Sequence, residues 1–236
     1  MIIPQKMKAK LADRIDYNKR YSLYRFDMSA PFKMKNLAGQ YVMIDVGEGQ
    51  KRAYSMCDRP DVDSSFELLV DHQPGGIGTT YLKNLPLGAE ISLVAPLGQL
   101  VVTPATNEAE MMVLLAGGCG IGAFRAILAD QLQNKRDQRT WLLLWVMDDD
   151  RQLFWQDDLM VMDKAFPNFK LVPIITYPSP EWQGQTGLLT DFVRDFSFPQ
   201  KTAFFLCGNP EMITQLKKIL TKKGVAPEMM ITEQAA

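Results

Sequence analysis

The spacing of apolar residues divides the chain into two parts, each with its own hydrophobic pattern. In the first hundred residues, short runs rich in strand formers, such as YVMIDV and FELLV, are separated by turn residues. Such a pattern is typical of a small antiparallel barrel or sandwich. It predicts one short helix near residues 78–84 and six strands, over residues 6–15, 21–28, 40–46, 52–57, 66–71 and 90–96.

Beyond a polar stretch at 103–110, which we interpret as a linker, apolar runs alternate with amphipathic segments. This alternation indicates a parallel sheet covered by helices on both sides. In the first predicted helix one apolar face contains Ile121, Phe124, Ile127, Leu128 and Leu132. We expect strands at 111–116, 141–146, 169–175 and 203–208, and helices at 121–133, 153–165, 187–194 and 210–222.

Length and charge indicate two domains and argue against a role in binding nucleic acid or membranes. A chain of 236 residues is comfortable for two domains. With 26 basic and 27 acidic side chains, no overall field favours nucleic acid or anionic lipid. The longest apolar and glycine stretch, 111–124, is too short to span a membrane, and the amino terminus lacks the apolar core of a signal peptide.

Cysteine and histidine usage argues against a metal site. Cys57, Cys119 and Cys207 are odd in number and lie far apart, without a C-x-x-C pair. This disfavours a disulfide framework, a zinc site or an iron-sulfur cluster, and favours a reducing, cytoplasmic compartment. With His72 as the only histidine, a histidine metal site or a Ser-His-Asp triad is also disfavoured.

Two glycine-rich turns follow predicted strands of the second part. GGCGIG at 117–122 comes after its first strand, and CGNP at 207–210 comes after what we take to be its last. Ligands of doubly wound sheets bind beyond the carboxyl ends of the strands. We therefore expect both turns to line one crevice, although the spacing is not that of the G-x-G-x-x-G fingerprint.

The first part carries two candidate binding motifs. Arg52 and Tyr54 alternate onto one strand face, where a guanidinium suits a phosphate and a tyrosine suits a planar ring. From these residues alone, an exposed Arg-Tyr pair on a β face is the favoured interpretation. The glycines that precede Thr79 suit an anion at a helix start, but a threonine helix cap would also explain them.

Five motifs in order resemble the ferredoxin-NADP reductase superfamily: R-x-Y-S, G-x-x-T-x-x-L, V-x-P-L-G, G-G-x-G-I and C-G-x-P-x-M. The resemblance covers nearly the whole chain. It implies a six-stranded antiparallel Greek-key β-barrel that binds FAD over residues 1–103. It also implies an α/β Rossmann-like domain with a parallel sheet that binds NAD(P)H over residues 108–236.

The same resemblance assigns roles in the barrel. Arg52 would pair with the flavin phosphates, Tyr54 would stack on the isoalloxazine ring, and Ser55 would hydrogen-bond flavin N5. The complete G-x-x-T turn favours FAD over FMN. The full set of implied flavin-binding residues is Arg52, Ala53, Tyr54, Ser55, Val70, Asp71 and His72 along the adenosine half, and Gly76, Gly78 and Thr79 at the pyrophosphate.

In the second domain the resemblance places the dinucleotide on the glycine turns. Gly117, Gly118, Gly120 and Ile121 would hold its pyrophosphate, and Cys207, Gly208 and Pro210 would lie near the nicotinamide. From the residues alone, a small buried apolar side chain is the favoured interpretation of Cys207. The candidate catalytic residues are Ser55, Tyr54, Cys207 and Glu233.

Acidic residues after the second strand of this domain bear on the choice of nicotinamide cofactor. Asp148 and the two aspartates that follow it would hydrogen-bond a ribose hydroxyl and repel a 2′-phosphate. This favours NADH over NADPH, although Arg151 and Lys170 could offset the charge.

Two positions depart from the family pattern. Ala123 stands where many relatives have proline, which we expect to loosen the turn. The chain ends at Glu233-Gln234-Ala235-Ala236, without the aromatic residue that covers the flavin in many relatives, so nicotinamide could reach the flavin directly.

These features predict an FAD-dependent oxidoreductase that takes hydride from NAD(P)H. It would pass electrons to a separate acceptor, such as ferredoxin, flavodoxin or an oxygenase component. Three alternatives stay open: a free-flavin reductase, since WQGQTG at 182–187 also resembles that branch; an electron-transfer subunit of a larger dehydrogenase; and a non-catalytic dinucleotide-binding module.

Overall fold

The computed structural model describes residues 2–73 and 75–234. Pro74, which precedes the first glycine turn, and Ala235 and Ala236 at the carboxyl end lie outside these ranges. The chain forms two compact units. The first contains the residues up to Val101 together with Gly122–Asn134, and the second contains Val102–Ile121 and the residues from Lys135 on.

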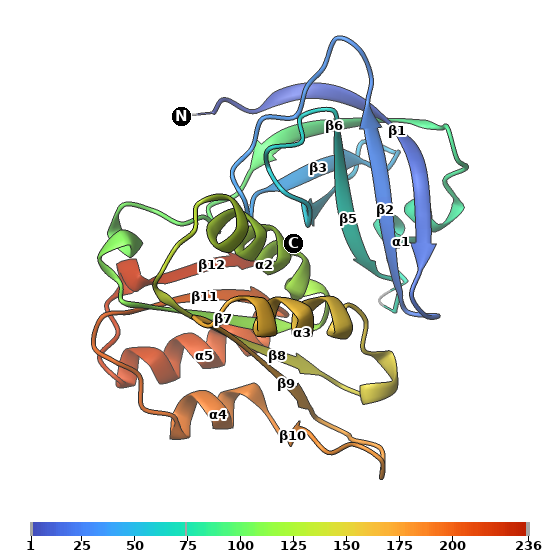
Figure 1. The fold of residues 1–236 in the computed structure, drawn as a ribbon. Helices are drawn as coiled ribbons and strands as arrows, with labels where there is room; N and C mark the ends of the chain where they lie inside the picture. Colours follow the sequence, from blue (N-terminus) through green and yellow to red (C-terminus); the bar gives the residue numbers. More distant parts are fainter. Residues whose placement is uncertain (1, 74, 235–236) are drawn as a thin grey trace. The chain divides into compact units, whose positions relative to one another are not determined.

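The first unit is a six-stranded antiparallel barrel, as predicted (Figure 1). Its sheet has the order β4-β3-β6-β1-β2-β5. The two outer strands meet where Met56 bridges Leu68 and the Cys57 amide donates to the Glu67 carbonyl at 2.9 Å. The elements are β1 Gln5–Asp16, β2 Tyr21–Met28, β3 Tyr41–Asp45, β4 Lys51–Ser55, β5 Ser65–Asp71, α1 Ile77–Asn84 and β6 Glu90–Leu97.

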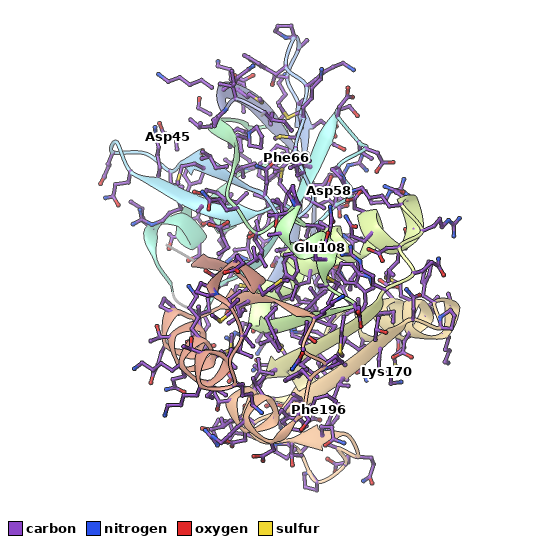
Figure 2. The ribbon with its side chains drawn as sticks, turned by 90° about the vertical axis from the view of Figure 1, so that its left-hand side faces the viewer. Asp45, Asp58, Phe66, Glu108, Lys170 and Phe196 are labelled. Carbon is purple, nitrogen blue, oxygen red and sulfur yellow. The ribbon has the colours of Figure 1, made fainter. Side chains whose placement is uncertain are left out.

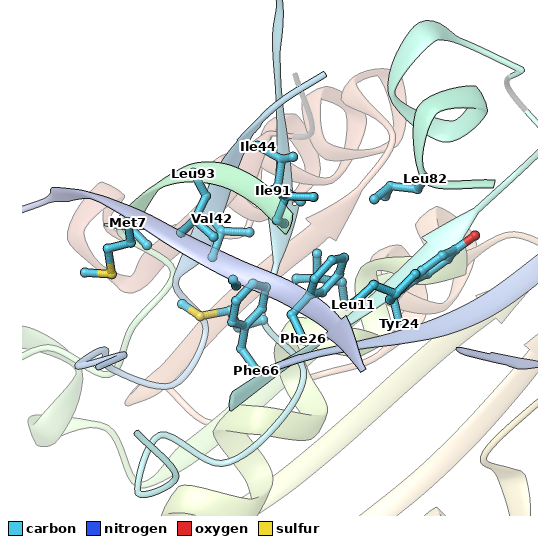
Figure 3. Close-up of a cluster of buried hydrophobic side chains, with 14 of the residues drawn as sticks. Met7, Leu11, Tyr24, Phe26, Val42, Ile44, Phe66, Leu82, Ile91 and Leu93 are labelled. Atoms are coloured by element: carbon cyan, nitrogen blue, oxygen red, sulfur yellow. The ribbon is translucent and has the colours of Figure 1, made fainter. Parts of the chain in front are cut away.

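Alternating apolar residues of these strands fill the barrel (Figure 3). β1 buries Met7, Ala9 and Leu11 and exposes the residues between them. The rings of Phe26 and Phe66 stack at 5.2 Å. Complete burial of such a side chain contributes roughly 1.5–3 kcal/mol, so this core holds the strands in register.

Helix α2, Ile121–Leu128, packs on the barrel from Gly122 onward. Its Arg125 Nη1 donates to the Cys57 carbonyl at 3.1 Å and to Glu67 Oε2 at 2.9 Å. A π-helical segment, Ala129–Asn134, continues the helix. The predicted apolar face is confirmed, since all five of its residues are buried: Ile121, Phe124, Ile127, Leu128 and Leu132.

Asp58, labelled in Figure 2, lies near Arg125 and Glu67, and the three charged side chains form an ion cluster. Its Oδ1 accepts a hydrogen bond from the Glu67 amide at 3.0 Å. Burial raises the pKa of this carboxyl to about 7. The cluster therefore holds a carboxyl group that ionises near neutral pH.

The raised pKa of Asp58 predicts a pH-dependent stability. Between about pH 4 and pH 7 the folded state binds a proton that the unfolded state has lost, so stability falls as pH rises through this window. The fall is on the order of 3 kcal/mol, because each pKa unit corresponds to about 1.4 kcal/mol. Asp58→Asn keeps an oxygen for the Glu67 amide and should flatten the slope, measured by urea unfolding at pH 5 and pH 8. The exposed Asp61→Asn should keep the slope, and an unchanged slope in Asp58→Asn would contradict the assignment.

The second unit is a six-stranded parallel sheet with the order β10-β9-β8-β7-β11-β12, as the alternating pattern predicted. Its strands are β7 Met111–Gly117, β8 Thr140–Met147, β9 Phe169–Ile175, β10 Gln185–Thr186, β11 Thr202–Gly208 and β12 Met230–Gln234. Its helices are α3 Gln156–Ala165, α4 Leu189–Asp195 and α5 Pro210–Lys222.

Helices α4 and α5 lie side by side on one face of this sheet (Figure 1). Leu189 and Val193 of α4 and Leu216 of α5 share a core with strand residues such as Val113 and Leu142. The alternate strand residues point to the opposite face, where the Trp145 ring meets Phe154 at 5.2 Å. No helix among the described residues is long and apolar enough to cross a membrane.

The structure corrects the predicted elements in several places, one of which is the two-residue strand β10, which was not predicted. β11 is not the last strand, because β12 follows α5 and pairs with β11; its short, partly polar sequence gives little strand signal. A 3₁₀ turn with buried Thr106 occupies Ala105–Glu108 in the predicted linker. α3 begins at Gln156, three residues later than predicted, because Trp155 adopts a left-handed conformation with φ 55°.

Candidate functional site

Strand β4 and helix α1 bring two of the predicted flavin-binding motifs together. Gly78 in the first turn of α1 lies so close to β4 that a Cβ there would be 2.5 Å from Tyr54 Oη and 2.7 Å from Arg52 Cγ. Arg52 and Tyr54 share one face of β4 because side chains alternate along a strand. The guanidinium, the phenol and the helix start thus form one surface.

The start of α1 leaves backbone donors for an anion. Gly76 is the N-cap, and no side chain caps the helix. The threonine-cap reading is therefore wrong: the Thr79 hydroxyl donates to the Gly76 carbonyl at 3.0 Å instead. A Cβ at Gly76 would meet nothing within 4 Å, so the space beside these amides is open. Uncapped amides at a helix start suit a phosphate.

Arg52 is held by weak local partners. Its Nη1 donates to the Lys51 carbonyl at 2.8 Å, and its Nη2 donates to Gln50 Oε1 at 3.1 Å. Both contacts are exposed to solvent, so a phosphate could replace them without leaving a buried group unpaired. Arg52, Gly76 and Gly78 therefore fit the phosphates of a flavin dinucleotide.

The remaining residues of β4 are placed by its pairing with β3. Ser55 lies opposite Tyr41 and Ala53 lies opposite Met43, and both are half-buried. Tyr54 packs its ring against the barrel core. The strand is thus held by its backbone and by Tyr54, which leaves the Ser55 side chain without a role in the core.

Residues 70–72 at the end of β5 differ in what they can offer a cofactor. Val70 buries its side chain in the barrel core, and Asp71 forms a 2.8 Å ion pair with Arg20. His72 Nε2 contacts Tyr24 Oη at 3.2 Å, while its buried Nδ1 has no partner among the described residues. Burial, helped by Arg14, lowers the pKa of His72. Asp71 is thus engaged by Arg20, and the unsatisfied Nδ1 of His72 is buried.

The two glycine turns of the second unit meet, because β7 and β11 are neighbours in the parallel sheet. A Cβ at Gly208 would lie 3.2 Å from Gly117 Cα. A Cβ at Gly120 would lie 2.4 Å from the Cys207 carbonyl oxygen. Gly118 has φ 53°, and its carbonyl accepts from Trp145 Nε1 at 3.0 Å. The close approach of these backbones explains why glycine occupies these positions.

Cys207 and Glu233 are adjacent in the sheet, since they are register partners of β11 and β12. Cys207 is 7% exposed. Burial raises the pKa of its thiol to about 12, and Cys119 and Glu233 add to the rise. The thiol is therefore neutral at physiological pH. Cys207 is thus a buried side chain, and it also lies at the glycine turns; the two interpretations from the sequence are compatible.

The loop after β8 carries the predicted ribose-binding carboxylates. Asp148 is exposed, and its carbonyl accepts from the Tyr177 amide at 2.8 Å. Asp149 binds Arg151 Nε at 2.9 Å. Asp150 accepts from the Ser179 amide and hydroxyl at 2.7 and 2.8 Å. Of the two cations expected to offset these charges, Arg151 is thus engaged by Asp149, and Lys170 pairs with Asp163.

Sequence reasoning missed two residues at the glycine turns. Asn209 caps α5, its Oδ1 accepting from the Met212 amide at 2.8 Å. Met212 places its Sδ and Cε at 3.0 Å from a Cβ position on Gly117. Asparagine before proline at a predicted helix start is a cap signal that could have identified Asn209, and Met212 is the last residue of the C-G-x-P-x-M motif, which could have pointed to it. Ala123, the departure from proline, is buried in α2.

Comparison with known families agrees with this division. Residues 8–102 match the oxidoreductase FAD-binding domain family, and residues 114–218 match the oxidoreductase NAD-binding domain family. FAD and a nicotinamide dinucleotide are therefore the cofactors of the two matched regions.

Individual relatives are reductase proteins. The chain is 28% identical over 193 residues to the anthranilate 1,2-dioxygenase electron transfer component of Acinetobacter baylyi, covering 80% of this chain and 55% of that protein. The chain thus spans little more than half the length of this relative.

Solved structures show the same fold. The Amycolatopsis cytochrome P450 reductase GcoB superposes with a TM-score of 0.88 at 25% identity, covering 98% of this chain and 70% of that chain. A Neisseria gonorrhoeae ferredoxin NADP+ reductase with bound FAD and NADP superposes with a TM-score of 0.85 at 20% identity, covering 97% of this chain and 98% of that chain. Two matched families, a shared fold and the five ordered motifs lead to one conclusion: the chain belongs to the ferredoxin-NADP reductase superfamily of FAD- and NAD-binding oxidoreductases.

Proposed function

We propose that this protein takes hydride from NADH onto bound FAD and passes the electrons to a separate acceptor. The observation that carries the proposal is the packing of Gly78 on Arg52 and Tyr54. It joins a cation, an aromatic ring and uncapped helix amides in one surface, which are the groups that a flavin dinucleotide requires. FAD supplies the redox chemistry, because its ring accepts two electrons as hydride and releases them singly.

The residues of the barrel bind and orient in this proposal. Arg52 neutralises phosphate charge, and the amides at the start of α1 donate to the same group. Tyr54 provides a flat face for the ring. The Ser55 hydroxyl donates to the ring nitrogen at which hydride arrives. Residues 1–103 would thus form the flavin domain and residues 108–236 the nicotinamide domain.

The glycine turns position the second cofactor. Gly117, Gly118 and Gly120 let the backbone approach a pyrophosphate, and Cys207, Gly208 and Pro210 border the nicotinamide. Because its pKa is about 12, the Cys207 thiol is uncharged and would contact the nicotinamide without supplying a charge. Glu233, its neighbour in the sheet, is the ionisable side chain that we assign beside it.

NADH is the favoured donor in this proposal. Its 2′-hydroxyl can donate to a carboxylate, whereas the 2′-phosphate of NADPH would face the three aspartates at 148–150. Arg151 is already engaged by Asp149, so binding a 2′-phosphate with it would require that ion pair to break.

The acceptor that fits this proposal is a one-electron protein. The A. baylyi relative is named as the electron transfer component of a dioxygenase. By analogy, an oxygenase component, a ferredoxin or a flavodoxin would receive the electrons here, in the cytoplasm.

Retention of the flavin distinguishes this proposal from a free-flavin reductase. Protein purified by gel filtration should stay yellow, and the flavin released by heat should elute with authentic FAD in chromatography. Colourless protein that reduces added riboflavin or FMN at the expense of NADH would favour the free-flavin alternative.

Arg52→Ala should weaken FAD retention about 10- to 100-fold, because charge-assisted bonds to phosphate contribute about 1.5–3 kcal/mol. The measurement is the ratio of FAD to protein after gel filtration, supported by titration of the apoprotein. Arg25→Ala on β2 is the matched control. Arg25 is exposed, and its ion pair with Asp27 is long, at 3.7 Å, so its loss should have little effect. Equal FAD content in Arg52→Ala and Arg25→Ala would refute the role of Arg52.

A further inference from the structure

Two thiols lie at the same glycine turn. Cys119 belongs to the 3₁₀ turn Gly118–Gly120, and Cys207 ends the neighbouring strand β11. A Cβ at Gly120, the residue after Cys119, would lie 3.2 Å from Cys207 Cβ. In the sheet, Cys207 pairs with Ala116, three residues before Cys119. Cys119 thus directly precedes the residue that contacts Cys207, and its thiol is close enough to influence the Cys207 thiol electrostatically.

The two thiols differ in their exposure to solvent. Cys119 is half-buried, and Cys207 is buried. Burial raises the pKa of Cys207 to about 12, and the nearby Cys119 contributes to that rise. An oxidant from solvent therefore reaches Cys119 first. Cys207 is the thiol that would then react with the oxidised Cys119. Cys57 lies in the barrel unit, fully buried.

We propose that Cys119 and Cys207 form a reversible disulfide under hydroperoxide stress and that this bond switches off use of the dinucleotide. The site goes beyond the proposed oxidoreductase activity, although its effect on turnover rests on that activity. A bond between the two residues would tie the turn to β11 beside Gly117 and Gly208, the residues at which we place the dinucleotide.

The chemistry balances with hydrogen peroxide as the oxidant. The Cys119 sulfur attacks one peroxide oxygen; a sulfur–oxygen bond forms, the oxygen–oxygen bond breaks, and water leaves. The Cys207 sulfur then attacks the sulfur of the sulfenic acid; the disulfide forms, the sulfur–oxygen bond breaks, and a second water leaves with the Cys207 proton. In total, two thiols and one peroxide give one disulfide and two waters.

Peptide mapping tests the bond directly. The full-length protein is treated with hydrogen peroxide, quenched with N-ethylmaleimide and digested with trypsin without reduction. The expected product joins residues 84–125 to residues 202–217, two hydrogen atoms lighter than the two peptides together. Thiols titrated after denaturation should fall from three to one per chain and return to three with dithiothreitol.

Cysteine variants distinguish a specific bond between Cys119 and Cys207 from oxidation of thiols in general. Cys119→Ser and Cys207→Ser should each remove the linked peptide, while Cys57→Ala should keep it. Sulfinic acid at Cys119 without any linked peptide, or a link that includes Cys57, would overturn the proposal. These readouts are taken without nicotinamide, so they do not depend on the oxidoreductase activity.

A second arm tests the switch. FAD-loaded protein in the linked form should lose at least about 10-fold in its rate of reduction by NADH and recover it with dithiothreitol. Linked protein that is reduced as fast as the thiol form would overturn the switch. If even the thiol form is not reduced, the proposed function fails, while the peptide map still decides whether the bond forms.

Discussion

Replacing Gly120 by alanine is expected to lower the rate of flavin reduction by NADH more than about 100-fold, because misplacing reacting groups by about an ångström can cost that much. The added Cβ would lie 2.4 Å from the Cys207 carbonyl oxygen and 2.7 Å from its carbon. Both are backbone atoms of β11, so the turn and the strand must separate to admit the methyl group. Overpacking of this kind also costs roughly 1–3 kcal/mol of stability.

Gly122→Ala is the matched control, two residues away. A Cβ there would meet Cys57 Cβ at 3.3 Å and Leu69 Cβ at 3.4 Å, so the adjacent backbone needs to move by only a small fraction of the shift that Gly120→Ala requires. Stopped-flow reduction and thermal unfolding should therefore change little in Gly122→Ala. A Gly120→Ala protein that is reduced by NADH at the wild-type rate would contradict the role assigned to this turn.

Removing the Ser55 hydroxyl should slow flavin reduction by about 100- to 1000-fold while FAD stays bound, because loss of one preorganised donor at a reacting atom has effects of this size. Ser55 ends β4, where its backbone faces Tyr41 and Tyr54 packs on the core. Alanine preserves both, so Ser55→Ala should fold and load FAD normally.

Rapid mixing with NADH measures this effect, and the FAD content of the same sample reports on binding. Ser92→Ala, on the exposed face of β6, is the control for loss of a strand hydroxyl. An unchanged rate constant in Ser55→Ala would remove Ser55 from the reaction.

The local patterns of the sequence predict most of the architecture. The alternation of Met7, Ala9 and Leu11 and the helical spacing of Phe124, Ile127 and Leu128 report burial directly, since each pattern has the period of its element. β12 was missed because a short edge strand needs few apolar residues. Its place comes from pairing with β11, a tertiary contact that local pattern does not contain.

The candidate site was predicted only in part, because local sequence patterns do not contain tertiary contacts. Motif order identified Arg52, Tyr54 and Gly78, but only the fold shows that Gly78 leaves space for the other two. The sequence likewise could not show that Arg125 binds Glu67, because the two residues lie 58 positions apart. Contacts distant along the chain depend on packing, which spacing alone does not encode.

Anaerobic reduction of the FAD-loaded protein tests the central claim most directly. NADH is titrated into the protein while the visible flavin absorption is followed. We expect complete bleaching at about one equivalent of NADH, because one hydride carries both electrons that FAD accepts, and slower bleaching with NADPH. Protein that retains FAD but leaves it oxidised in the presence of excess NADH would contradict the proposed hydride transfer.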